Sequence, residues 1–349
     1  MKKFFSLIIV LIFTLSVYSQ SDACTIFTKQ QNGRVLVGNN EDWMYSIPST
    51  FWIAAPENDT YGRICFANST YVQGGMNEKG LFYDGATCPA SEIPHFKGKP
   101  ELGMDLGEII ISKCANVREA VEMIKKYNIT RSFTDHIMFT DQSGDSVVIE
   151  WMNNDLKIIP KKGTYQLITN FWLTDPELGG YPCTRYDKAK TMLEDKDEIN
   201  VDVFAGILKA VLADWGDMGT KYSNVYDLKK REVFIYNKGD FSKYVRYNLP
   251  DELKKLKKGK KVNYKLDKVF RDNTDVLLSP VENERQNIQV GHTGTQIVND
   301  EKDSVLKSKG VPVKKNGVFI LYFLIAIIAI LLPIVVITVL RKMKNKDLI

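Results

Sequence analysis

The chain has 349 residues, of which 44% are hydrophobic and 26% charged, and its formal net charge at pH 7 is +5. This composition is that of a globular protein with room for one large or two average domains, which excludes a wholly disordered or fibrous chain. Much of the positive charge lies in a lysine-rich run at 254–261 and at the C-terminal end, without the interleaved arginine and aromatic residues of nucleic-acid sites. We therefore expect no nucleic acid as a partner.

Residues 1–23 have the three parts of a secretory signal peptide. Two lysines near the start precede an apolar stretch at 4–17, and small or polar residues follow it. The small residues Ser21 and Ala23 predict cleavage directly before Cys24. A lipoprotein signal is the alternative, but it needs a branched apolar residue where Ser21 stands. Cleavage would make Cys24 the first residue of the mature chain.

From residue 24 to residue 273 the sequence predicts one α+β domain. β-prone segments bounded by turn residues are expected at 25–28, 35–39, 51–54, 71–74, 81–84, 136–140, 146–151, 156–160, 165–169, 222–228 and 232–236. Helical periodicity is expected at 105–127, 185–193 and 201–213. Because strands and helices come in separate runs, we expect a layered fold with mostly antiparallel sheets rather than parallel βαβ units.

The C-terminal part of the sequence predicts a membrane anchor. Residues 274–316 are polar and turn-prone, and we expect them to form a stalk. Residues 317–340 are long enough to span the hydrocarbon core of a bilayer, which takes about 20 apolar residues. The basic tail at 341–349 places the C-terminus in the cytoplasm. The sequence thus predicts a single-pass type I membrane protein with its domain in the periplasm or at the cell surface.

The chain has five cysteines, and an odd number leaves at least one thiol unpaired in an oxidising compartment. They are Cys24, Cys65, Cys88, Cys114 and Cys183. If Cys24 is the reactive one, the other four can form two disulfides, whose connectivity the sequence leaves open, or stay as buried thiols.

A cysteine at a chain N-terminus combines a nucleophile with a base. Its α-amine has a reference pKa of about 7.7–8.0, so part of it is unprotonated at neutral pH and no catalytic histidine is needed. The chain has only His95, His136 and His292, with no pair at metal-ligand spacing. A papain-like pair would have to use His136, for which we prefer an ordinary strand position. We therefore expect neither a metal nor a cofactor.

Six short motifs follow one another along the domain. They are Cys-Thr-Ile-Phe at 24–27, Gly-Asn-Asn-Glu-Asp-Trp at 38–43, Gly-Met-Asn-Glu-Lys-Gly-Leu at 75–81, Thr-Asn-Phe at 169–171, Thr-Arg-Tyr at 184–186 and Ser-Asn-Val-Tyr-Asp-Leu at 223–228. In this order they resemble choloylglycine hydrolases and penicillin V acylases, which are N-terminal-nucleophile hydrolases of linear amides. The resemblance implies an αββα sandwich of two antiparallel sheets, with Cys24 opening a central strand.

The resemblance also implies roles for individual residues. Cys24 would be the nucleophile, and Asp42 would accept hydrogen bonds from its α-amine. Arg185 would stabilise the thiolate, because a nearby cation lowers the pKa of a thiol. Asn170 would donate its side-chain N–H to the oxyanion of the tetrahedral intermediate. Thr87 stands where relatives often have Asn or Tyr, and its backbone N–H would be the second oxyanion donor.

Asn39 is the main departure from the family pattern. Many bile-salt and penicillin enzymes have an arginine at this position, and its absence would leave the thiol less activated. Arg34 is no substitute, because five residues away on an extended strand it points to the opposite face. The motif is closer to an acyltransferase-like branch, in which an amide residue is common here. Neither bile salts nor penicillins are therefore inferred as substrates.

Together these observations predict a hydrolase that cleaves a small-molecule N-acyl amide through an acyl-thioester on Cys24. Transfer of the acyl group to an amine instead of water is the second hypothesis. A non-catalytic surface binding module with the same fold is the third. The acyl and amine parts of the substrate stay open, as does the formation of an oligomer.

Overall fold

The computed structural model describes residues 24–272 and 277–278, apart from residues 70, 103–105, 130–133 and 197. The predicted signal peptide, membrane segment, cytoplasmic tail and most of the predicted stalk lie outside this part. None of the described helices is long and apolar enough to cross a membrane.

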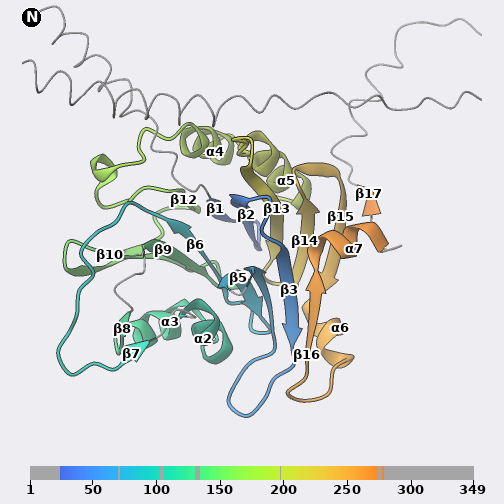
Figure 1. The fold of residues 1–349 in the computed structure, drawn as a ribbon, viewed down its shortest axis with the longest axis horizontal. Helices are drawn as coiled ribbons and strands as arrows, with labels where there is room; N and C mark the ends of the chain where they lie inside the picture. Colours follow the sequence, from blue (N-terminus) through green and yellow to red (C-terminus); the bar gives the residue numbers. More distant parts are fainter. Residues whose placement is uncertain are drawn as a thin grey trace, which may run out of the picture. The chain divides into compact units, whose positions relative to one another are not determined.

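Two antiparallel sheets form the centre of the fold (Figure 1). The first has the order β12-β1-β2-β13-β14-β15-β17, with β1 (Thr25–Gln31), β2 (Arg34–Met44), β12 (Tyr165–Ile168), β13 (Met218–Asp227), β14 (Glu232–Asn237), β15 (Asp240–Asn248) and β17 (Leu277–Leu278). The second has the order β11-β10-β9-β6-β5-β4-β3-β16, with β3 (Ser49–Ala54), β4 (Arg63–Asn68), β5 (Tyr71–Asn77), β6 (Phe82–Thr87), β9 (Asp135–Thr140), β10 (Ser146–Met152), β11 (Asp155–Pro160) and β16 (Lys261–Lys265). A short parallel pair, β7 (Glu101–Leu102) with β8 (Asn128–Ile129), stands apart.

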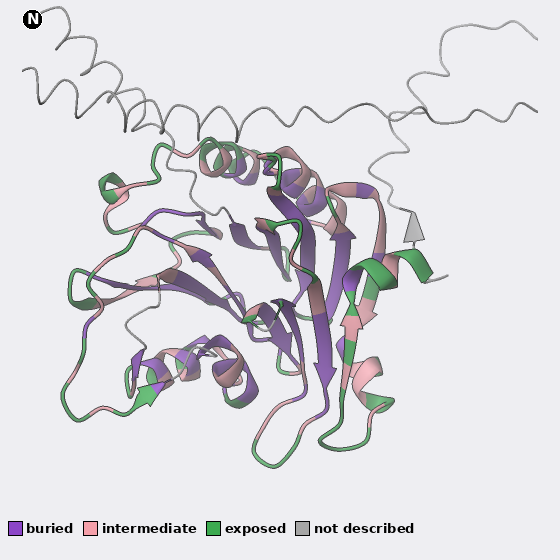
Figure 2. Ribbon diagram, in the orientation of Figure 1, coloured by how far each residue is buried: buried purple, intermediate pink, exposed green. Residues whose placement is uncertain are grey.

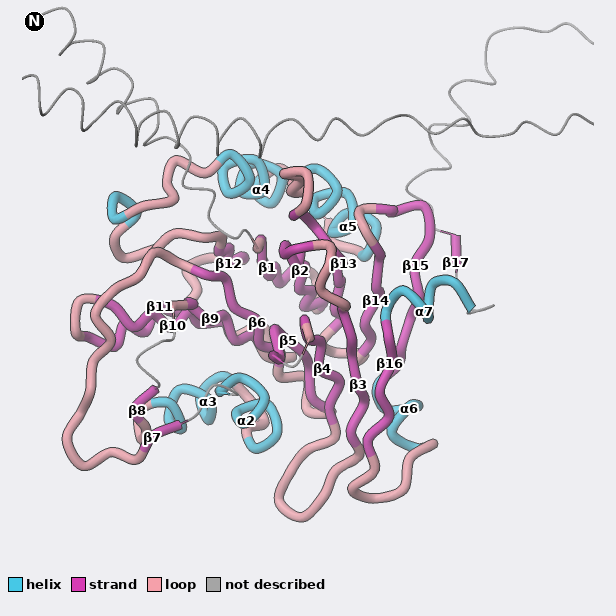
Figure 3. Tube along the Cα trace, in the orientation of Figure 1, coloured by secondary structure: helices cyan, strands magenta, loops and turns pink. Residues whose placement is uncertain are grey.

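Helices cover the outer face of each sheet, as Figure 3 also shows. The helices α4 (Thr184–Glu194) and α5 (Val201–Ala210) pack on the first sheet, where Phe204 contacts Phe27 of β1 with ring centroids 5.0 Å apart. The helices α2 (Leu106–Lys113) and α3 (Val117–Ile124) pack on the second sheet. A 3₁₀ turn (Pro176–Leu178) and the short helices α6 (Leu249–Lys254) and α7 (Leu266–Asp272) complete the described elements. The predicted sandwich of two antiparallel sheets is thus confirmed.

The main core lies between the two sheets, and the strands that enclose it are largely buried (Figure 2). Along β1, Ile26 points into this core, whereas the next residue, Phe27, points outward to the helices. Successive side chains of a strand alternate between its two faces. This alternation decides which polar residues at the end of β1 and β2 face the second sheet and which face α4 and α5.

The structure differs from the sequence-based expectation at several elements. The single helix expected over 105–127 is two helices, because the first ends at Lys113 and Asn116 begins the second as its N-cap, where its side chain accepts the backbone N–H of Glu119 at 3.0 Å. The strand β4 was not expected, since burial on both faces removes the alternation that marks a half-buried strand. The strand β17 pairs with β15 beyond residue 273, where the sequence places the end of the domain.

The structure also decides between the two alternatives left open for the cysteines, and it corrects the position expected for β1. All five cysteines lie in the described part of the chain, and each is a free thiol, so the two disulfides considered from the sequence are not formed. The strand β1 is an inner strand but not a central one, because only β12 lies outside it in the first sheet.

Candidate active site

The register of β1 and β2 places Cys24 beside the Gly-Asn-Asn-Glu-Asp-Trp motif. Thr25 pairs with Asn40 and Ile26 with Asn39, so continuing the antiparallel ladder by one residue sets Cys24 opposite Glu41. Both side chains face the second sheet, and the Sγ of Cys24 lies 3.9 Å from Oε2 of Glu41. Cys24 is 8% exposed and Glu41 is 1% exposed. The candidate nucleophile is thus a buried thiol in contact with a buried carboxyl.

Asp42 faces the opposite side of β2, where a β-bulge in β13 supplies its partner. The ladder between these strands shifts register between Thr220 and Tyr222, which brings Thr220 opposite Asp42. The hydroxyl of Thr220 donates to Oδ1 of Asp42 at 2.5 Å, and the same hydroxyl accepts the backbone N–H of Ala213 at 2.9 Å. The other oxygen of Asp42, Oδ2, is buried and accepts no hydrogen bond.

Arg185, in the first turn of α4, reaches down onto the start of β1. Its Nη1 donates to the carbonyl oxygen of Cys24 at 3.0 Å and to Oγ1 of Thr25 at 2.9 Å. The same nitrogen lies 3.7 Å from Oδ2 of Asp42. The guanidinium therefore holds the backbone of Cys24 next to the Asp42 carboxyl.

Asn170, two residues after β12, joins this cluster to the second sheet. Its Oδ1 accepts a hydrogen bond from Nη2 of Arg185 at 3.1 Å, and its Nδ2 donates to the carbonyl oxygen of Thr87 at 2.9 Å. Because an amide nitrogen carries two N–H donors, one N–H of Asn170 is not used by Thr87. The two residues that the sequence predicts as oxyanion donors are thus in contact.

Asn39 does not face the solvent or the thiol but a buried carboxyl. Its Nδ2 donates to Oδ2 of Asp84 on β6 at 2.6 Å, and Oδ1 of Asp84 accepts the backbone N–H of Gly85 at 2.8 Å. Arg34 lies on the other face of β2, where its Nη1 donates to the carbonyl oxygen of Ile199 at 3.2 Å. The prediction that Arg34 cannot replace the missing arginine is therefore confirmed.

Burial governs the electrostatics of the cluster. Burial, together with the charges of Glu41 and Asp42, raises the pKa of the Cys24 thiol well above its ordinary value. Burial raises the pKa of Asp42 to about 7, although Arg185 and Thr220 act in the opposite direction. Burial likewise raises the pKa of Asp84 to about 8 and that of Glu41 well above its ordinary range. With residues 1–23 still attached, the site strongly favours the neutral thiol.

His136 has a structural position that stabilises the segment around Asn170. Its ring lies 3.1 Å from Oε1 of Glu150 through Nδ1, and Nε2 lies 2.6 Å from the carbonyl oxygen of Thr169. Burial alone would lower the pKa of His136, but Cys88 and Glu150 raise it to about 10, so both ring nitrogens carry protons and donate. Glu150 also accepts the backbone N–H groups of Leu173 and Thr174 at 2.6 and 3.2 Å. The pair holds the segment on both sides of Asn170.

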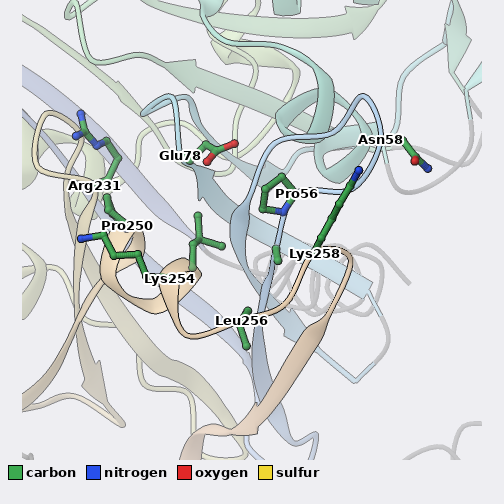
Figure 4. A pocket seen from close by; sticks show the side chains of 10 residues that line it. Pro56, Asn58, Glu78, Arg231, Pro250, Lys254, Leu256 and Lys258 are labelled. Carbon is green, nitrogen blue, oxygen red and sulfur yellow. The ribbon is translucent and has the colours of Figure 1, made fainter.

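A pocket of about 500 Å³ adjoins the cluster. Thr87 and Asn68, two of its lining residues, connect it to the site: the Thr87 carbonyl binds Asn170, and Nδ2 of Asn68 donates to Oε1 of Glu41 at 2.8 Å. Trp43 and Tyr71 supply aromatic surface to the same pocket. A second pocket of about 630 Å³, with Glu78, Arg231 and Lys254 in its wall (Figure 4), shares no residue with the cluster around Cys24. Of these two pockets, the one of about 500 Å³ is thus the one that shares residues with the hydrogen-bond network around Cys24.

Comparisons with known proteins show which family the chain belongs to. Residues 24–200 match the family described as linear amide C-N hydrolases, choloylglycine hydrolase family, which is just over half of the 349 residues. Because the match covers more than half of the chain, the protein belongs to the choloylglycine hydrolase family of linear amide C-N hydrolases. The resemblance predicted from the six motifs is thereby confirmed. No curated protein matches the chain.

Solved structures share this fold. The penicillin V acylase from Agrobacterium tumefaciens superposes with a TM-score of 0.52 at 18% identity, covering 62% of this chain and 83% of that chain. An arginine-to-leucine variant of the conjugated bile acid hydrolase from Clostridium perfringens gives a TM-score of 0.56 at 19% identity, covering 69% and 97%. A cysteine-to-alanine mutant of the same hydrolase gives a TM-score of 0.50 at 17% identity, covering 73% of this chain and 96% of that chain. At these identities the likeness concerns the fold alone.

Several residues of the site had no role in the sequence-based prediction. Glu41 stands inside one of the six motifs, but its contact with Cys24 depends on the β1–β2 register. Asp84 and Asn68 come from the second sheet, and Thr220 reaches Asp42 only through the bulge in β13. In the described ranges, no group of three or more His, Cys, Asp and Glu residues is arranged so that it could hold a metal ion.

Proposed function

We propose that the protein hydrolyses the linear amide bond of a small N-acyl compound, with Cys24 as an N-terminal nucleophile. The observation that carries the proposal is the state of Asp42. Its Oδ2 is buried without a hydrogen-bond partner, and its backbone N–H reaches the sulfur of Cys24. A buried acceptor without a donor is costly. The α-amine that cleavage before Cys24 releases is the donor this position fits.

The reaction then proceeds in two halves. The free α-amine takes the thiol proton, and the thiolate attacks the amide carbonyl carbon, with Asn170 and the backbone N–H of Thr87 as donors to the oxyanion. The resulting ammonium gives its proton to the leaving nitrogen as the C–N bond breaks, which leaves an acyl-thioester. The amine next removes a proton from water, whose oxygen attacks the thioester, and the acid leaves as the proton returns to the sulfur.

Removal of residues 1–23 would therefore act as the activating step. Before cleavage the nitrogen of Cys24 is an amide, which is no base, and the surrounding carboxyls disfavour the thiolate. After cleavage the same nitrogen is an amine that can accept the thiol proton, and the ammonium formed in that transfer stabilises the thiolate next to it. This coupling supports secretion by a signal peptide and a site outside the cytoplasm as parts of the proposal. The apolar segment 317–340 supports attachment to the membrane as a single-pass type I protein.

The test uses the full-length protein produced in a secreting host and a panel of N-acyl amides. Cys24→Ala should abolish release of the amine, whereas Cys114→Ala, which removes a buried thiol on the far side of the second sheet, should retain activity. Equal activity of Cys24→Ala and the parent protein would exclude the mechanism. Adding free amines distinguishes the outcomes further: new amides would indicate acyl transfer, and free acid alone would indicate hydrolysis.

A further inference from the structure

Glu41 touches the reacting sulfur, yet the steps above give it no part. Its Oε2 lies 3.9 Å from Sγ of Cys24, within hydrogen-bond range for a sulfur. The side chain is fully enclosed between the sheets, and no lysine or arginine donates a hydrogen bond to it in the described part of the chain. A group of this kind next to a nucleophile affects its reactivity in either protonation state.

The hydrogen bonds around Glu41 determine which of its oxygens can carry a proton. The hydroxyl of Ser49 donates to Oδ1 of Asn68 at 3.0 Å, and in this orientation the other end of the Asn68 amide, Nδ2, points away from Ser49. Nδ2 of Asn68 therefore faces Glu41 and donates to Oε1 at 2.8 Å. Since Oε1 already accepts a donor, a proton on Glu41 sits on Oε2, the oxygen that faces the sulfur.

The charged groups around Glu41 favour this neutral form. Acidic groups on three elements act on it through their charge, and the cation that acts on it is partly engaged elsewhere: the Nζ of Lys221 donates to the carbonyl oxygen of Ile47. Burial first, then the charges of Asp84 and Asp42, raise the pKa of Glu41, while Lys221 lowers it. The ionisable groups that act on it are Asp42 on β2, Asp84 on β6, Asp135 on β9 and Lys221 on β13.

We propose that Glu41, as a neutral carboxylic acid, donates a hydrogen bond from Oε2 to the sulfur of Cys24 once the thiol proton has moved to the α-amine. No proton changes hands in this contact: the O–H bond of Glu41 stays intact, and the hydrogen bond is lost when the sulfur binds the carbonyl carbon. The acid thus stabilises the thiolate at a site that lacks the arginine of many family members. Asn39 occupies that position, and its side-chain N–H donates to Asp84 and not to the sulfur. The inference rests on the proposed function, because it assumes that Cys24 reacts as a thiolate.

The experiment compares Glu41→Gln with Glu41→Met in the processed full-length protein. The rate of Cys24 alkylation by iodoacetamide is followed against pH, alongside kcat/KM for an N-acyl amide that the parent protein cleaves. Glutamine can accept from Asn68 through Oε1 and donate to the sulfur through Nε2, so it should keep both quantities within about threefold. Methionine has no donor, so the alkylation profile should move up by about one pH unit, with kcat/KM about tenfold lower or more.

Two results would overturn the proposal. If Glu41→Gln lowers the alkylation rate and kcat/KM as much as Glu41→Met does, then Glu41 acts as an ionised base and not as a hydrogen-bond donor. If Glu41→Met matches the parent protein, Glu41 has no part in thiolate stabilisation. Glu41→Ala serves as a second donor-free variant, with thermal unfolding as the check on folding. The alkylation profile needs no substrate, so failure of the parent protein to cleave any amide would reject the proposed function and still leave this inference tested.

Discussion

Nη2 of Arg185 donates to Oδ1 of Asn170 at 3.1 Å, while Nη1 of the same guanidinium donates to the carbonyl oxygen of Cys24 at 3.0 Å. One rigid side chain from α4 thereby fixes the distance between the candidate nucleophile and the candidate oxyanion donor. Because a planar guanidinium presents its donors in fixed directions, a lysine could not hold both partners in this way. The arrangement makes Asn170 the most informative residue to change.

Replacing Asn170 with alanine should lower kcat by about 10² to 10³, the usual cost of removing one oxyanion donor. The amide contacts only the Thr87 carbonyl and Arg185, so the fold should survive. Steady-state kinetics with an N-acyl amide measures the effect. Asn237→Ala, which removes a partly exposed amide at the end of β14, is the matched control and should leave kcat unchanged. A fall of less than threefold for Asn170→Ala would argue against its role as a donor.

The Thr220–Asp42 hydrogen bond should be visible in the pH dependence of the reaction. The Thr220 hydroxyl lowers the pKa of Asp42, so Thr220→Val should raise that pKa. If ionised Asp42 orients the α-amine, the acidic limb of the kcat/KM profile then moves to higher pH. Thr220→Ser keeps the hydroxyl for both Asp42 and the Ala213 N–H, and should keep the parent profile. If the acidic limb of the kcat/KM profile stays in place in Thr220→Val, ionisation of Asp42 does not determine the pH dependence of the reaction.

The buried pair of His136 and Glu150 should contribute strongly to stability. Glu150→Gln removes the negative charge that pairs with the buried imidazolium of His136. It also replaces one acceptor oxygen by an NH₂ group, which cannot accept the hydrogen bonds that Glu150 receives, such as that from the backbone N–H of Leu173. Removing one partner of such a pair typically costs about 3–5 kcal/mol in the free energy of unfolding. Urea unfolding of the processed protein measures this cost. Glu122→Gln, which breaks the exposed pair with Lys125, should have no measurable effect. Equal stabilities of the two variants would contradict the assigned role.

Glu41 should reduce the stability of the folded protein as the pH rises. Its pKa is raised on folding, so the folded state holds a proton that the unfolded state releases above about pH 4.3. The free energy of unfolding therefore falls over the range between the unfolded and the folded pKa. Glutamine does not titrate, so the melting temperature of Glu41→Gln should exceed that of the parent protein by a margin that grows from pH 4.5 to pH 8. A margin that stays constant or shrinks would show that the Glu41 pKa is not raised.

The sequence predicted the residues at the centre of the site better than their surroundings. Cys24, Asp42, Asn170 and Arg185 lie in short motifs, and the structure brings all four together. The partners of these residues come from other strands: Asp84 reaches Asn39 across the gap between the sheets, and Thr220 depends on a bulge. No local pattern encodes a register or a bulge, so these contacts could not be inferred from the motifs.

The secondary structure was likewise predicted correctly at some elements and missed at others. Strands such as β1 and β14 were predicted, although most of their residues are buried, because they are rich in β-prone residues and end next to turn residues. The strand β4 is buried on both faces, and the 105–127 segment keeps its helical periodicity through the break before Asn116. In both places the tertiary environment, and not the local pattern, decides the element.

The most direct test of the central claim is the mass of the N-terminal peptide of active protein, taken before and during turnover of an N-acyl amide. The proposal requires that the active chain begin at Cys24 and that the same peptide gain the mass of the acyl group during turnover, with loss of that gain after treatment with hydroxylamine. Fully active protein that retains Ala23 before Cys24 would contradict it, because the nitrogen of Cys24 would then be an amide and could not act as the base.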